Sequence, residues 1–255
     1  MHRVGSSLIG YKIAANDGEI GTVSDFLFDD NTWKLRWLVV DTGNWLPGRL
    51  VLVHPSAIGT PQDREEVLPV RLSKKQIEDS PDISSDRPVS RQMEHTVYGY
   101  YGWDPLWGDG YFGPGMMSSS LSPQPLLDRD ASRAMEGAPL TDDGGDPHLR
   151  SMSAIKGTGI AATDGEIGHV ENLLIDDVAW AVRYLIVDTS NWWFGQHVLI
   201  APFGVRSISW ADQVITLTLS REKVKASPVW DPMAVMDRAY QQRLHTHYDW
   251  PGYGW

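Results

Sequence analysis

Acidic residues at turn-forming positions are the first candidates for chemistry in this sequence. Asp17 and Glu19 flank a glycine, and Asp164 and Glu166 repeat the same spacing. Carboxylate oxygens suit a hard cation, but Ca²⁺ takes about six to eight oxygen ligands, and so short a loop supplies few of them. Asp and Gly also favour tight turns. We therefore expect turn formation at both places, with cation binding as the alternative.

Two pairs of adjacent carboxylates, Asp29-Asp30 and Asp176-Asp177, have the composition needed for acid–base chemistry. No histidine or nucleophile accompanies both pairs at a common spacing, so the sequence does not support catalysis at either of them. Aspartates are also common where a hairpin turns. We expect both pairs to lie in solvated turns.

A C-terminal cluster, His245, His247 and Asp249, resembles a set of metal ligands. Residues two apart on a helix point to different sides, however, so we expect aromatic-like packing, with metal binding as the alternative. The sequence contains no Gly-x-Ser-x-Gly motif, P-loop, dinucleotide glycine fingerprint or His-Glu-x-x-His motif. We therefore expect no catalytic residue, no cofactor and no bound metal, in a protein that is not an enzyme.

Two arginines, Arg36 and Arg183, lie in strand-like runs of β-branched and apolar residues. Each can pair with an aspartate further along its own run, Asp41 or Asp188, or with a neighbouring strand. In either case we expect a structural cross-strand ion pair.

The overall charge and composition exclude several classes of function. The chain has 22 Lys and Arg residues against 33 Asp and Glu, a net charge of −11, and no basic patch, so nucleic acid is a disfavoured partner. It has no cysteine for disulfides, thiolate chemistry or zinc binding. No apolar run approaches the roughly 20 residues that a membrane span needs. The N-terminal residues also lack the apolar region that a secretory signal needs. We expect a soluble cytoplasmic protein, with a peripheral place at the inner membrane as the alternative.

An internal duplication sets the organisation of the chain. The run IAANDGEIGTV at 13–23 returns as IAATDGEIGHV at 160–170, and this offset of 147 holds without a gap as far as Trp103 and Trp250. About a third of the aligned positions are identical. We expect one module at 1–103, a second at 157–255, and between them a mostly disordered linker, 104–156, rich in Gly, Pro and Ser.

Each copy is predicted to be mainly β. In the first copy, strand patterns occur at 9–14, 21–29, 35–41, 50–53 and 66–72. Strands at such short spacing predict a small barrel or a strongly bent sheet. Ser73 and Gln76 then form a capping box that begins a short helix, which Pro81 ends. The expected fold is two small β-barrels, each followed by short α-helices.

A second helix in each copy is indicated by apolar residues four positions apart. They are Val89, Met93, Val97 and Tyr101 in the first copy and Met236, Tyr240, Leu244 and Tyr248 in the second. We expect this apolar face to pack on a barrel or on the other copy, with a membrane-surface helix as the alternative. The same residues are candidates for contact with a partner.

Aromatic residues at a predicted loop are the other candidates for an interaction surface. Trp192 has its counterpart in Trp45, so both are expected to serve packing within a module. Trp193 and Phe194, in contrast, stand where the first copy has Leu46 and a proline. Large exposed apolar side chains are typical of contact surfaces, so we expect Trp193 and Phe194 to receive an outside partner or to cover the first barrel. Trp45, Leu46 and Trp192 are further candidates for contact at these loops.

Several of these motifs together resemble the PRC-barrel family. In the first copy they are IGYKIAANDGEIGTVSDFLFDD, RWLVVDTGNW and VLVHPSAI, and in the second GIAATDGEIGHVENLLIDD, RYLIVDTSNW and VLIAPFGV. The resemblance implies a small β-barrel that acts as a docking module in the photosynthetic reaction centre H subunit, in a bacterial ribosome-maturation factor and in stand-alone bacterial proteins. This chain lacks the membrane helix of the former and the other domain of the latter.

The function expected from these observations is that of a non-catalytic interaction or scaffold protein with a protein partner. Its two modules are expected to pack on each other as a pseudo-dimer, with further self-association as an option. One alternative is an accessory subunit or assembly factor of a membrane electron-transfer or photosynthetic complex. A further alternative, a ribosome or RNA maturation factor, is disfavoured by the acidity of the chain.

Overall fold

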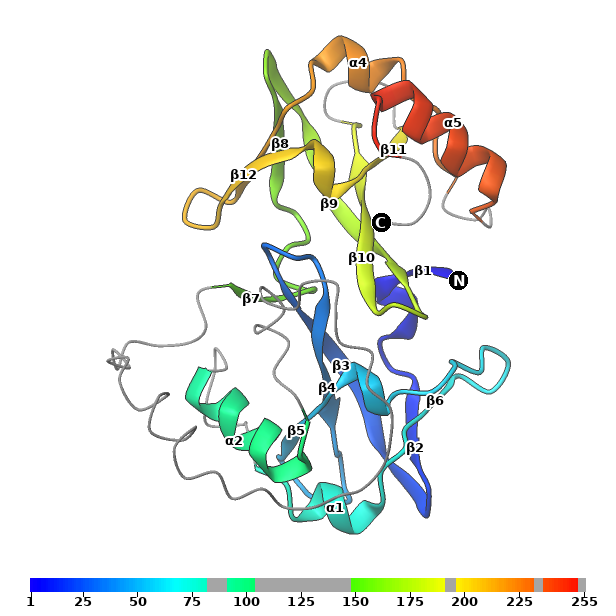
Figure 1. Cartoon of the computed structure of the whole chain (residues 1–255), viewed down its shortest axis with the longest axis vertical. Coiled ribbons are helices and arrows are strands. Elements are labelled where there is room, and N and C mark those ends of the chain that lie inside the picture. Colours follow the sequence, from blue (N-terminus) through cyan, green and yellow to red (C-terminus); the bar gives the residue numbers. More distant parts are fainter. Residues whose placement is uncertain (82–90, 104–147, 191–195, 232–235, 252–255) are drawn as a thin grey trace, which may run out of the picture.

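The computed structural model describes residues 1–81, 91–103, 148–190, 196–231 and 236–251. These residues form two mixed β-sheets, one built mostly from each copy of the duplication, with short helices at their outer sides (Figure 1). The mainly β prediction is therefore confirmed. None of the helices in these described ranges combines the length and apolar character needed to cross a membrane.

The sheet of the first copy has the strand order β5-β4-β3-β2-β6. Its strands are β2 (Lys12–Ala15), β3 (Gly18–Asp29), β4 (Leu35–Asp41), β5 (Leu50–Val53) and β6 (Val67–Pro69). All neighbours on this path are antiparallel except β2 and β6, which run parallel. One 3-10 turn, η1 (Gly5–Leu8), precedes β2, and another, η2 (Pro55–Ala57), lies between β5 and β6.

The sheet of the second copy repeats this topology in the order β11-β10-β9-β8-β13-β12. Its strands are β8 (Gly159–Ala162), β9 (Gly165–Asp176), β10 (Ala181–Asp188), β11 (His197–Ile200), β12 (Val205–Ser209) and β13 (Val214–Leu217), with η4 (Pro202–Gly204) before β12. The parallel pair is β8 with β13, which corresponds to β2 with β6. The duplicated sequence therefore folds as duplicated structure.

Each copy contributes its first strand to the sheet of the other copy. Strand β1 (His2–Val4) pairs antiparallel with β9, and β7 (Leu149–Ser151) pairs antiparallel with β3. The two pairings have the same register, because Arg3 lies opposite Ile175 and its counterpart Arg150 lies opposite Phe28. No pattern in the sequence predicted this exchange.

The hairpins that follow β3 and β9 also meet each other. Leu35 donates its backbone N–H to the carbonyl of Trp180, and Val182 donates in the same way to Trp33, each over 2.8 Å. Since these two bonds are related by the offset of 147, the two copies meet around an approximate two-fold axis. A bridge between Lys34 and Ala181 lies between the two bonds.

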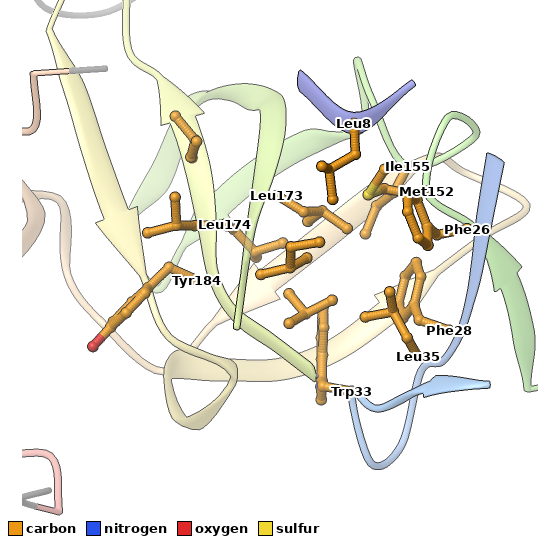
Figure 2. Packing of buried hydrophobic residues seen from close by; sticks show 14 of the residues in the cluster. Leu8, Phe26, Phe28, Trp33, Leu35, Met152, Ile155, Leu173, Leu174 and Tyr184 are labelled. Carbon is orange, nitrogen blue, oxygen red and sulfur yellow. The ribbon is translucent and has the colours of Figure 1, made fainter. Parts of the chain in front are cut away.

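The apolar core is continuous across the two sheets. Figure 2 shows the buried side chains that meet there from both copies, with Leu8, Met152 and Ile155 beside Phe26. Phe26 of the first copy stacks on Trp180 of the second with ring centroids 5.9 Å apart. Because burial of apolar surface is the main stabilising contribution to folding, this shared core links the stability of one sheet to that of the other.

A glycine of the repeated DGEIG motif permits a close crossing of strands in each copy. Gly21 has a φ of +148°, and a Cβ on it would collide with the carbonyl oxygen of Asp41. Gly168 is placed against Asp188 in the same way. These glycines therefore serve backbone packing, which accounts for their presence in both copies of the motif.

In the described part of the chain, α-helices cover the outer sides of the sheets. They are α1 (Lys74–Glu78), α2 (Arg91–Tyr101), α4 (Arg221–Lys225) and α5 (Arg238–Tyr248). The predicted capping box is confirmed: Ser73 Oγ accepts the N–H of Gln76 over 3.2 Å, and Gln76 Oε1 accepts the N–H of Ser73 over 2.9 Å. Helix α1 ends at Glu78, before Pro81.

The predicted strands agree with the structure in the middle of the module and differ at its ends. Those at 35–41 and 50–53 match β4 and β5, whereas β2 begins only at Lys12, because Gly5–Leu8 forms a 3-10 turn and Gly10 has a φ of +87°. Most of the expected linker, 104–156, lies outside the described residues, but its end carries β7. The module bounds 1–103 and 157–255 stay predictions.

Candidate functional site

The first aspartate of each adjacent pair organises its own hairpin turn. Asp29 Oδ1 accepts the backbone N–H groups of Asn31 (3.0 Å) and Thr32 (2.8 Å), and Asp176 accepts that of Val178 over 3.0 Å in the second copy. Burial would raise the pKa of Asp176, but hydrogen bonds from the backbone and from Arg183 outweigh it and hold that pKa below its usual value. These carboxylates are structural acceptors.

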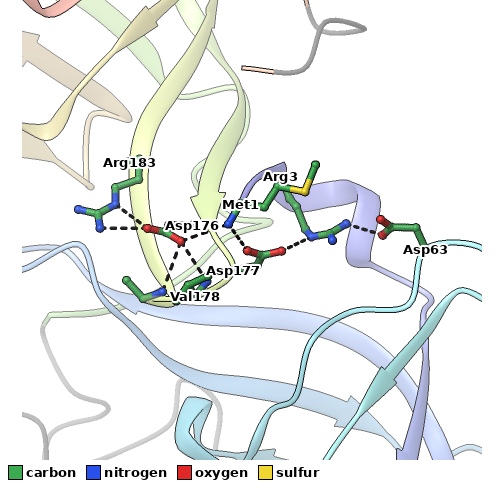
Figure 3. Close-up of polar contacts among 8 residues, drawn as sticks. Met1, Arg3, Asp63, Asp176, Asp177, Val178 and Arg183 are labelled. Atoms are coloured by element: carbon green, nitrogen blue, oxygen red, sulfur yellow. Dashed lines mark hydrogen bonds and ion pairs between the residues drawn. The ribbon is translucent and has the colours of Figure 1, made fainter. Parts of the chain in front are cut away.

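The second aspartate of the later pair binds the N-terminal strand of the chain. Asp177 accepts hydrogen bonds from the Met1 amine and from Arg3 Nε, each over 2.5 Å, and Arg3 also pairs with Asp63 (Figure 3). The Asp177 side chain is only 5% exposed. It thus anchors strand β1 to the sheet of the second copy.

The corresponding aspartate of the first copy does the same for the other exchanged strand. Asp30 accepts from Arg150 Nε and contacts His148 Nδ1, each over 3.0 Å, and it also accepts from Trp210 Nε1 over 2.7 Å. Its side chain is 9% exposed. Arg3 and Arg150 are equivalent residues, and so are Met1 and His148. We call Asp177 with Met1 and Arg3, and Asp30 with His148 and Arg150, the two exchange clamps.

The exchange clamps overturn the expectation that these aspartate pairs lie in solvated turns. The turn itself was predicted correctly, but Asp177 is buried and the half-buried Asp30 has a side chain that is only 9% exposed, each against a segment from the other copy. The partners are far away in the sequence, so local turn composition carried no sign of them. Each aspartate therefore fastens the two copies together.

Arg36 and Arg183 form cross-strand pairs with aspartates on the neighbouring strand. Arg183 Nη2 lies 3.1 Å from Asp176, and Arg36 Nη1 lies 3.5 Å from Asp29. The structural pairing that we expected is confirmed for the neighbouring-strand alternative. Asp41 instead accepts the backbone N–H of Gly43 over 2.8 Å.

A buried charged group in the first copy was missed by the sequence analysis. Glu94 in helix α2 is 0% exposed, and its carboxylate accepts from Arg36 Nη2 over 2.5 Å and from the Trp37 indole N–H. Arg36 is 2% exposed. The only signal was a polar residue three positions before Val97 in an apolar stripe, repeated by the buried Gln241 in the second copy.

The C-terminal histidines pack in the manner expected from the sequence. His245 is buried, donates from Nδ1 to the carbonyl of Pro251 over 2.5 Å, and accepts from the Tyr184 hydroxyl at Nε2 over 2.7 Å. His247 donates to the carbonyl of Lys223 over 2.8 Å. In the parts of the chain that the structure describes, no three His, Asp or Glu side chains are grouped to hold a metal ion.

The DGE turns join each sheet to the helix that follows it. Asp17 Oδ1 accepts the backbone N–H of Lys74 at the start of α1, and Asp164 accepts that of Arg221 at the start of α4, each over 2.7 Å. A carboxylate at a helix N-terminus is stabilised by the free amides there. Turn formation, the favoured interpretation of this motif, is what the structure shows.

The apolar helix residues proposed as an interaction surface are largely covered by their own module. Val97, Leu244 and Tyr248 are buried. Tyr101 and Tyr240 are partly buried, and Tyr101 stacks on Trp103 at 4.1 Å. The side chain of Met93, which belongs to α2, lies outside the described residues. The predicted packing is therefore confirmed for the described side chains of the stripe, and Val97, Leu244 and Tyr248 are not available to a partner. Val89 lies outside the described residues.

The aromatic loop candidates are only partly described. Trp45 and Leu46 are half-buried, and the Lys74 ammonium lies 4.8 Å from the centre of the Trp45 ring. Trp192, Trp193 and Phe194 lie outside the described residues. Their role as contact residues stays a prediction from the sequence.

Two cavities lie where the copies meet, and the duplication relates one to the other. The larger has a volume of about 760 Å³ and is lined by the hairpin at 30–34 together with the segment at 202–210. The smaller, of about 590 Å³, is lined by the hairpin at 177–180 and the segment at 54–60. Both volumes are in the range of small-molecule sites.

The histidine beside the smaller cavity is kept neutral by its surroundings. His54 is in contact with the rings of Trp37, Tyr98 and Trp103, and burial lowers its pKa to about 4. Its Nδ1 accepts the backbone N–H of Ser56 over 3.2 Å, which requires an unprotonated nitrogen. Protonation of His54 therefore opposes the folded state.

Acidification is expected to destabilise the protein through His54. The pKa of His54 rises to about 6.5 when the chain unfolds. The stability that the neutral imidazole contributes is therefore fully present above pH 6.5 and is lost as the pH falls towards 4. We expect a loss of about 2 kcal/mol between pH 7 and pH 4.5. Urea unfolding of the wild type and of His54→Phe at both pH values checks this, since the variant lacks that loss. Equal pH dependence in the two proteins would contradict it.

Comparison with known proteins agrees with the resemblance for the first copy. A family model described as PRC-barrel domain matches residues 4–79. A protein of Deinococcus radiodurans, described as an uncharacterized protein, is 35% identical over 81 residues, which cover 32% of this chain and 29% of that protein. The similarity of the second copy to this family rests on the internal duplication and stays a prediction. Residues 4–79 are thus similar to PRC-barrel domains.

Proposed function

We propose that this protein is a non-catalytic scaffold in which two PRC-barrel-type modules are packed as a covalent pseudo-dimer that docks a protein partner. The observation that carries the proposal is the reciprocal exchange of β1 and β7. Two modules that share strands and core residues present their surfaces at a fixed spacing, as the subunits of a symmetric dimer do. A fixed spacing is what a scaffold needs.

The non-catalytic part of the proposal is supported by the roles of the side chains that could do chemistry. Asp30 and Asp177 hold exchanged strands, Asp17 and Asp164 accept amides at helix starts, and His245 fills a core position. Each of these groups has a structural partner at hydrogen-bonding distance. Their presence is therefore explained without a reaction.

The docking part of the proposal rests on the difference between the copies at one loop. Trp193 and Phe194 stand where the first copy has Leu46 and Pro47. Aromatic residues carry a large share of the binding energy in protein interfaces. We therefore assign partner contact to this loop of the second copy.

The experiment is quantitative affinity capture of the full chain from its native cell, with the wild type beside Trp193→Ala/Phe194→Ala. We expect the wild type to recover one partner protein in a fixed ratio. The recovered amount of that partner should fall at least about tenfold with the double variant. Leu46→Ala, at the equivalent loop, is the control and should retain the partner. Equal recovery with all three proteins, or no protein in a fixed ratio, would refute the docking surface. Recovery of electron-transfer subunits would identify the partner as a membrane complex.

A further inference from the structure

The larger cavity between the copies has a composition that differs from the rest of the chain. Its charged lining residues are Asp30, Lys34, His148, Arg150, Arg183 and Arg206. Four of them, Lys34, Arg150, Arg183 and Arg206, are permanent cations, and Asp30 is the one carboxylate among the described residues that line the cavity. The whole chain carries −11. Cations concentrated in a concave site attract and hold anions.

Aromatic rings lie on the same wall as these cations. The Trp210 ring lies 4.6 Å from the guanidinium of Arg150, and its indole N–H is fixed by Asp30. Phe203, which also lines the cavity, is 41% exposed. The apolar ring of a ligand can therefore pack on aromatic side chains in the same cavity that holds the positive charges.

Three lining residues of the larger cavity differ in kind from their counterparts in the first copy. Arg206 stands where the first copy has Gly59, Phe203 where it has Ser56, and Trp210 where it has Asp63. Arg206 adds a positive charge, Phe203 adds an aromatic ring, and Trp210 replaces a negative charge with a ring, all in the larger cavity. Packing of the module does not require them, since the first copy folds with the smaller residues.

We propose that the larger cavity binds a small organic anion that also carries a flat apolar group. Arg206 faces the charged group, and Phe203 and Trp210 receive the ring. The site holds one ligand per chain, because the first copy has Gly59, Ser56 and Asp63 at the equivalent positions. This ligand site goes beyond the scaffold role and does not depend on it.

Isothermal titration calorimetry at low salt tests the site with two probes. They are 1-naphthyl phosphate and 2,6-naphthalenedicarboxylate, which separate a phosphate ligand from a carboxylate ligand. We expect one site per chain for at least one probe, and binding that weakens as sodium chloride is added. Inorganic phosphate, which has no ring, should bind about tenfold more weakly than 1-naphthyl phosphate.

One variant in each of the two cavities makes the test specific. Arg206→Gly installs the residue of the first copy at an exposed position and should weaken binding about tenfold. Arg71→Ala, which alters the smaller cavity, should change binding less than about twofold. Unchanged thermal unfolding of both variants shows that the fold is intact. The proposal is overturned if neither probe saturates, if Arg206→Gly binds as the wild type does, or if Arg71→Ala weakens binding equally.

Discussion

Replacement of Glu94 by alanine is expected to lower the free energy of unfolding by about 3–5 kcal/mol. The carboxylate is fully buried between Arg36 and the Trp37 indole, so its removal leaves the buried guanidinium without a short-range charge partner on helix α2. A buried charge that loses one of its partners retains its desolvation cost and loses part of its compensation, although Asp29 remains 3.5 Å from Arg36 Nη1. Urea unfolding at neutral pH, followed by tryptophan fluorescence, measures the loss.

The second copy and an exposed ion pair supply the controls for this experiment. Glu94→Gln installs the residue found at the equivalent position, Gln241, and should cost less than the alanine variant because an amide oxygen still accepts hydrogen bonds. Lys75→Ala removes an exposed partner of Asp79 and should change stability by no more than about 0.5 kcal/mol. If Glu94→Ala were as mild as Lys75→Ala, the burial of this charge would be disproved.

Removal of the carboxylate in one exchange clamp is expected to cost about 2–4 kcal/mol. Asp177→Ala deprives both the Met1 amine and Arg3 of a buried acceptor. It also weakens the attachment of β1 to β9, the strand with which β1 pairs within the described residues. Asp30→Ala, in the other clamp, should cost a similar amount because it deprives Arg150 and Trp210. Chemical denaturation of both variants measures the two losses.

A double-mutant cycle separates the clamp from general effects. Arg3→Ala combined with Asp177→Ala should show a coupling of about 1–2 kcal/mol, since each change removes the same contact. Asp63→Ala removes the exposed partner of Arg3 and should cost less than about 1 kcal/mol. Additive losses for Arg3 and Asp177 would show that the clamp does not hold β1.

Much of each module could be predicted because its determinants are local. The strands at 35–41 and 50–53 are short apolar runs, and the capping box of Ser73 is a pattern of four residues. The duplication added independent support, since each pattern occurs twice. The helix stripe was recognised for the same reason, and its burial follows from the apolar side chains at i and i+4.

The connections between the modules could not be predicted, because nothing in the sequence next to them determines the partner. Strands β1 and β7 have three residues each, too few to show a period of two. Asp30 and Asp177 were interpreted from their turn composition, while their partners come from the other copy. Glu94 resembles any solvated helix glutamate until Arg36 is seen beside it. The residues of the larger cavity come from segments far apart in the sequence, so local patterns could not indicate that they lie together.

The reciprocal exchange also determines the order in which the chain can fold as it is synthesised. The first sheet lacks β7 until the ribosome has translated residues 149–151, so the β3 edge is uncovered while the whole intervening segment is made. Strand β1 leaves the ribosome first and stays unpaired until β9 is made, because β9 lies more than half the chain away in the sequence. Uncovered strand edges invite pairing with other chains. Nascent copies of this protein on one messenger RNA are therefore positioned to exchange strands with one another, and chaperones that shield strand edges are expected to act on the first half of the chain.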